Sequence, residues 1–130
     1  MAMYAFALRI LPGKTETMKK YLQEIKTTRR EEFVKSRQRM GVHAVQVWLQ
    51  HTPNGDIGAV WVDVDNPTKF FDLLMNSNEP FDVWFREKII TECQGIDPGD
   101  TPPNQNELLL EISGIGQPTR TQSYAEAQKK

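Results

Sequence analysis

The chain has 130 residues, the length of one domain that can bury a core without disulfides or metals. Its 16 Lys and Arg residues nearly balance its 17 Asp and Glu residues, giving a formal charge of -1. This balance argues against nucleic acid or membrane partners, and the lone cysteine excludes an internal disulfide. We expect a soluble cytoplasmic protein, because the apolar stretch at residues 1–11 is too short for a signal sequence or a membrane span.

The hydrophobic pattern predicts six elements in the order strand, helix, strand, strand, helix, strand: 3–10, 15–40, 43–50, 57–64, 67–89 and 107–112. The first helix ends before Gly41 and is poor in apolar residues at 27–32, where we expect it to bend or to extend past the sheet. Asn76-Ser77-Asn78 interrupts the second helical region, and the segment 95–105, rich in Gly and Pro, predicts a loop.

The Asn54-Gly55 pair predicts the register between the two central strands. It favours a two-residue type I′ turn, since both central residues need positive φ, and that turn would place Trp48 opposite Trp61. Pro53 cannot donate to the strand ladder beside the turn. A longer loop of four residues would still leave the two tryptophans on one face.

The right-handed crossover rule turns this order into an α+β ferredoxin-like βαββαβ sandwich with the antiparallel sheet order 4-1-3-2. Both helical regions would cover one face of the sheet. The other face would carry two tryptophans among alanines, an exposed patch that usually marks an interaction site. We expect a second copy to cover it, leaving a cavity between the sheets. The domain is predicted to span 1–112, with the tail 113–130 mobile or docked on the partner subunit.

Two stretches resemble a known superfamily: Tyr4-Ala5-Phe6-Ala7-Leu8-Arg9-Ile10-Leu11-Pro12-Gly13-Lys14 and Asn78-Glu79-Pro80-Phe81-Asp82. Together with the long first helix and the aromatic-bearing hairpin, they resemble the dimeric α+β barrel superfamily, and within it a branch of unassigned role. The superfamily includes cofactor-free antibiotic-biosynthesis monooxygenases, muconolactone isomerases, rhamnose mutarotases and stress-responsive barrel proteins. The resemblance covers about residues 3–112. It implies a homodimer with a cavity between helices and sheet or between two sheets.

Five residues of the helix-free face are the predicted ligand contacts: Arg9, Gln46, Trp48, Trp61 and Asp63. Arg9 could hold a ligand carboxylate or stack on a tryptophan, or it could pair with Glu107 or Glu111. Asp63 with Gln46 could be a base and its orienting group, or a solvated cross-strand pair. No catalytic residue is assigned.

No metal or cofactor is predicted. His43 and His51 lie at opposite ends of one strand, about 26 Å apart at ~3.3 Å per residue, which is too far to share a metal ion. Cys93 has no histidine placed near it and is expected to be a semi-buried thiol. A basic run along the first helix is interpreted as a solvated face: Lys19, Lys20, Lys26, Arg29, Arg30, Lys35, Arg37 and Arg39.

The sequence therefore predicts a homodimer that binds a small apolar or aromatic molecule in a cavity lined by the helix-free face. A cofactor-free monooxygenase or isomerase of a small organic substrate is an alternative, so the question of catalysis stays open. Single-stranded RNA binding is another alternative, because RNA-recognition domains share this element order. Residues 56–63 lack the basic start and successive aromatics of that motif. The last alternative is a purely structural dimer in which the tryptophans seal the interface.

Overall fold

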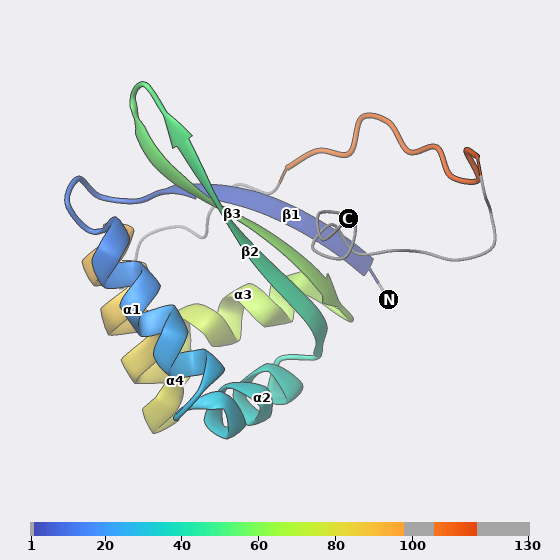
Figure 1. Cartoon of the computed structure of the whole chain (residues 1–130). Helices are drawn as coiled ribbons and strands as arrows, with labels where there is room; N and C mark the ends of the chain where they lie inside the picture. The colour runs from blue at the N-terminus through green and yellow to red at the C-terminus, as the bar shows by residue number, and fades with distance from the viewer. Residues whose placement is uncertain (1, 98–105, 117–130) are drawn as a thin grey trace.

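A computed structural model describes residues 2–97 and 106–116 of the chain (Figure 1). Its elements follow in chain order: β1 (Ala2–Arg9), α1 (Thr15–Lys26), α2 (Arg30–Arg39), β2 (Val42–Thr52), β3 (Gly55–Val64), α3 (Pro67–Asn76), α4 (Pro80–Phe85) and the π-helix η1 (Arg86–Cys93). The strands form an antiparallel sheet in the order β1-β3-β2. All the helices lie on one side of this sheet (Figure 1), so the protein is a two-layer α+β structure.

The order β1-β3-β2 agrees with three consecutive strands of the predicted 4-1-3-2 sheet. The predicted fourth strand is not formed in the described residues, although Asn106 N donates to the carbonyl of Ala5 on β1 at 2.8 Å. Beyond this bond the chain leaves β1 and runs outward (Figure 1). Leu109 is 85% exposed, and its apolar neighbours in the segment are similarly uncovered.

The predicted hairpin register is wrong by two residues. Thr52 pairs with Gly55, so Trp48 lies opposite Ala59 instead of opposite Trp61. Pro53 explains this difference, because its fixed φ suits the first central position of a type I turn. Gly55 then occupies the last position of the turn. Among the described residues only glycines have positive φ, which excludes a type I′ turn centred on Asn54. Because the shift is an even number, both tryptophans stay on the helix-free face.

The predicted first helix is divided into α1 and α2. The break falls at Thr27, whose hydroxyl donates to the carbonyl of Gln23 at 2.8 Å, while Arg29 N donates to Glu24 O at 2.8 Å. A threonine bonded to the preceding turn competes with the regular helix pattern, and no apolar side chain holds this stretch on the sheet. The expected bend is therefore a complete interruption.

Two groups of buried side chains hold the layers together. The larger one joins the sheet to α3, to η1 and to Met40 directly after α2: Phe6, Met40, Val42, Val62, Val64, Phe70, Phe71, Leu74, Met75 and Ile90. The smaller one joins α1 to α4 and η1: Ile10, Met18, Ile25, Phe81, Ile89 and Cys93. No helix in the described ranges is long and apolar enough to cross a membrane.

Candidate functional site

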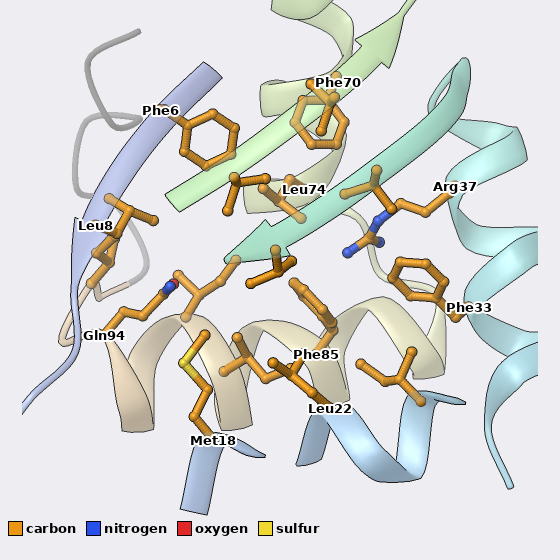
Figure 2. A pocket seen from close by; sticks show the side chains of 18 of the residues that line it. Phe6, Leu8, Met18, Leu22, Phe33, Arg37, Phe70, Leu74, Phe85 and Gln94 are labelled. Carbon is orange, nitrogen blue, oxygen red and sulfur yellow. The ribbon is translucent and has the colours of Figure 1, made fainter. Parts of the chain in front are cut away.

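A cavity of about 90 Å³ lies between the covered face of the sheet and the helices (Figure 2). Its apolar walls come from both layers: Phe6, Leu8, Met18, Leu22, Ile25, Phe33, Val45, Val47, Val60, Val62, Phe70, Leu74, Met75, Phe85, Ile89, Ile90 and Ile96. Protein interiors are normally close-packed, with few voids larger than a water molecule. An engineered apolar cavity of about 150 Å³ binds benzene, so the space here suits a somewhat smaller occupant.

Two polar side chains also line the cavity, and both are buried. Arg37 of α2 is 7% exposed, and Gln94, directly after η1, is 5% exposed. They lie on opposite sides of the space in Figure 2. The remaining described residues of the lining are apolar. A largely apolar pocket with a few placed polar groups is the usual form of a small-molecule site.

The Arg37 guanidinium points into the cavity (Figure 2) and rests on two phenylalanine rings. Its central carbon lies 4.5 Å from the ring centroid of Phe33 and 4.3 Å from that of Phe85. Nη1 donates to Ser36 Oγ at 2.9 Å and lies 3.8 Å from the Met40 sulfur. Nε and Nη2 make no hydrogen bond to any residue in 2–97 or 106–116.

Burial lowers the pKa of Arg37 from its usual value to about 10, which leaves it charged at neutral pH. Asp82 raises this pKa and Arg39 lowers it, but neither effect outweighs burial. The shift corresponds to about 3 kcal/mol of unfavourable burial of the charged form. No described carboxylate forms an ion pair with Arg37, whereas buried charges are normally paired. A buried cation that faces a cavity without an ion-pair partner among the described residues is a candidate ligand-binding group.

Asp82, the acidic residue nearest to this network, is occupied by other groups. Its carboxylate accepts hydrogen bonds from Ser36 Oγ, from Ser77 Oγ at 2.6 Å and from Arg39 Nη2 at 3.0 Å. Burial raises the pKa of Asp82, but these three bonds and the Arg39 charge lower it overall. Asp82 is therefore ionised at neutral pH, paired with Arg39, and linked to Arg37 only through the Ser36 hydroxyl.

Gln94 supplies the second buried polar group. Its amide nitrogen lies 3.7 Å from the point that a Cβ on Gly58 of β3 would occupy, so the side chain lies against the sheet. The amide makes no hydrogen bond within the described part of the chain. The cavity thus offers a cation at one side, an amide at the other, and no carboxylate, histidine or thiol among its described lining residues.

The five predicted contact residues lie on the opposite face of the sheet, and none of them lines this cavity. The register places Trp61 between Ala5 and Gln46. Trp48 Nε1 donates to Gln46 Oε1 at 3.1 Å, so these three predicted residues are brought together. Asp63 is one row away, opposite Met3, and its buried Oδ1 has no hydrogen-bond partner among the described residues. Arg9 lies at the far end of β1, opposite Ile57.

Other predicted residues fall in ordinary environments. His43 pairs with Asp65 and His51 with Asp56, each at 2.7 Å and both histidines exposed. The described residues contain no cluster of His, Cys, Asp and Glu that could hold a metal ion. Cys93 is fully buried, and burial raises the pKa of its thiol, which makes it less reactive.

Sequence reasoning missed Arg37 and Gln94. Arg37 was grouped with a solvated basic run, yet it lies four residues after Phe33 and three before Met40 on the apolar stripe of the helix. That position was the available signal. Nothing in the sequence around Gln94 distinguishes it from a polar residue at a helix end.

Comparison with known proteins adds no assignment. No family model matches this chain, and no curated protein sequence matches it. The resemblance to the dimeric α+β barrel superfamily therefore stays a prediction.

Proposed function

We propose that this protein binds a small, largely apolar molecule in the cavity between its sheet and its helices. The observation that carries the proposal is an apolar space of about 90 Å³ with two buried polar side chains that have unused hydrogen-bonding capacity. The described lining contains no carboxylate, histidine or thiol that could accept a proton at neutral pH. Binding therefore has more support than acid–base catalysis, and the monooxygenase and isomerase alternatives have no residue to assign.

The edge strand β2 supplies a route into the cavity. Val47 lines the cavity although it is 44% exposed. A second space of about 60 Å³ lies beside it, bordered by Trp48 and Leu49 of β2 and sharing Met18, Leu22 and Val47 with the first. A ligand would enter between β2 and α1, where Trp48 borders the outer space.

The cavity can be tested by filling it. Val60→Phe on β3 would direct a larger side chain into the space, and Val34→Phe on the exposed surface of α2 is the matched control. In a thermal-shift screen of small apolar compounds, we expect hits with the parent and with Val34→Phe that disappear with Val60→Phe. The proposal fails if no compound stabilises the parent, or if Val60→Phe keeps the same hits.

We further propose that the protein is a cytoplasmic homodimer with the four-stranded 4-1-3-2 sheet of a dimeric α+β barrel. The support is a segment of exposed apolar side chains that begins beside β1: Leu108, Leu109, Leu110, Ile112 and Ile115. Met3 and Trp48 on the helix-free face are also about half exposed. A second copy could cover both surfaces, with 107–112 added to a β1 edge.

Light scattering after size-exclusion chromatography tests this assembly. We expect a dimer for the parent and a folded monomer for Leu108→Glu/Leu110→Glu, because both leucines are 74% exposed in the single chain and contribute little to its core. Lys69→Glu, an exposed charge change on α3, is the control and should remain dimeric. A monomeric parent would refute the dimer and leave the ligand site untouched.

A further inference from the structure

We infer that the molecule held in this cavity is a small carboxylate, with its anionic end bound by Arg37 and its apolar part in the space between sheet and helices. The inference rests on the proposed function and names the chemical class of the ligand. It starts from a single observation: a buried guanidinium faces the cavity, and two of its three nitrogens have no partner among the described residues.

The unused donors lie along one edge of the guanidinium group. Ser36 accepts from Nη1, so Nε and Nη2 remain, and these two nitrogens form the side-on fork that matches the two oxygens of a carboxylate. The Phe33 and Phe85 rings contact the guanidinium through its flat faces. The edge in the guanidinium plane is therefore the direction left for a hydrogen-bonded ligand.

The charge of the site favours a monoanion. Arg37 is the only charged residue among those described in the lining, so one negative charge would neutralise it. A phosphate monoester carries about 1.5 to 2 negative charges at neutral pH and would leave an excess charge buried. A carboxylate balances the cation without that excess.

Ser36 and Asp82 act as positioning residues for Arg37. The Ser36 hydroxyl donates to Asp82 and accepts from Arg37, which fixes the rotation of the guanidinium. Asp82 does not compete as an internal anion, since Ser36, Ser77 and Arg39 already donate to it. The network thus holds the cation in place and leaves its charge available.

The volume sets an upper limit on the ligand. At about 90 Å³ the cavity is smaller than the ~150 Å³ space that accommodates benzene. Propionate has fewer non-hydrogen atoms than benzene and is a suitable probe, and propionamide is its neutral counterpart of nearly the same shape. Weak binding of such small molecules can be measured by NMR titration.

The test compares both probes on the parent, Arg37→Met and Arg37→Lys, with Arg30→Met on the exposed surface of α2 as control. We expect the parent and Arg30→Met to bind propionate at least about ten-fold more tightly than propionamide, corresponding to one charge-assisted contact. Arg37→Met should lose this preference. Arg37→Lys keeps the charge without the planar fork and should retain only part of it, which provides a second readout if Arg37→Met does not fold.

The outcomes separate the two proposals. Equal binding of propionate and propionamide, or an unchanged preference in Arg37→Met, would overturn the carboxylate inference while leaving a cavity that binds neutral molecules. Failure of the parent to bind propionate would also overturn it. Failure of the wider compound screen with the parent would overturn the proposed function itself.

Discussion

Replacing Arg37 with methionine should change the free energy of unfolding of the ligand-free protein by less than about 1 kcal/mol. Burial lowers the pKa of this arginine from its usual value to about 10, an unfavourable contribution of about 3 kcal/mol. Two ring contacts of about 1 kcal/mol each and one hydrogen bond of about 1 kcal/mol favour burial of Arg37 and oppose this contribution. These contributions nearly cancel, and methionine would keep apolar contact with both rings.

Arg39→Met is the informative comparison, because this arginine is 41% exposed and would ordinarily be the more dispensable one. Its removal leaves the buried Asp82 carboxylate with only the two serine hydroxyls as donors. We expect a loss of about 1–3 kcal/mol, the usual result of removing one partner of a buried charged group. The half-exposed arginine should therefore matter more for stability than the buried one.

Urea denaturation of the ligand-free proteins, followed by circular dichroism, measures both changes. If Arg37 is instead a structural residue, its removal should cost about 3–5 kcal/mol, the loss seen when one partner of a buried ion pair is removed. A loss of that size for Arg37→Met, with a smaller loss for Arg39→Met, would refute the reasoning. Arg30→Met, on the exposed surface of α2, should leave stability within about 0.5 kcal/mol.

Two further predictions concern Asp82 and the core. Hydrogen bonding and the Arg39 charge lower the pKa of Asp82 overall, although burial raises it. Ionised Asp82 should therefore stabilise the folded parent, and this stabilisation should be lost as pH falls below about 4 and through the folded-state pKa. Thermal denaturation across this range should show a weaker acid dependence for Asp82→Asn, and coincident profiles would contradict this. Phe71→Ala, which removes a buried ring 5.4 Å from Phe6, should lower the free energy of unfolding in urea by about 3–5 kcal/mol. A loss below about 1 kcal/mol would mean that this ring is not part of the core.

The layer arrangement could be predicted because it depends on regular periodicities. Alternation along 3–10 correctly identifies β1, and Asn66-Pro67 correctly marks the beginning of α3, where the Asn66 side chain accepts from Lys69 N at 3.1 Å. The parity of the hairpin also survives, since it depends on alternation alone. These features are local, and local sequence is sufficient to specify them.

The exact hairpin register and the helix break depended on competition between local signals. Pro53 and Asn54-Gly55 favour different turns, and the structure follows the proline. At Thr27 a side-chain hydrogen bond replaces the regular helix pattern, although the apolar spacing on either side continues. Sequence alone could identify each competing signal, but not which one is energetically stronger.

The five predicted contact residues and the cavity lie on different faces of the sheet for a physical reason. Tryptophans on a predicted helix-free face indicate an uncovered apolar surface. A cavity is a gap in side-chain packing, and no residue pattern in the sequence indicates it. The buried position of Arg37 results from how α2 packs after the break at Thr27, so it depends on tertiary structure. A charged residue on an apolar helix stripe is the one indication that the sequence carries.

The two faces of the sheet can therefore serve separate purposes. The cavity is bounded by side chains of one chain, from both strands and helices, and Arg37 is buried in that single chain. Trp48 is exposed on the opposite face of the sheet, and Leu108, Leu109 and Leu110 are exposed in the segment beyond β1. A second copy on the helix-free face would lie across the sheet from the cavity, because the central strand carries Val60 and Val62 into the cavity and Trp61 toward the opposite side. Alternate residues of β3 thus serve the two faces, and Trp48 of β2 belongs to the helix-free face but also borders the outer space beside the cavity. Assembly and ligand binding could therefore be coupled through a change in β3 or at the edge strand β2.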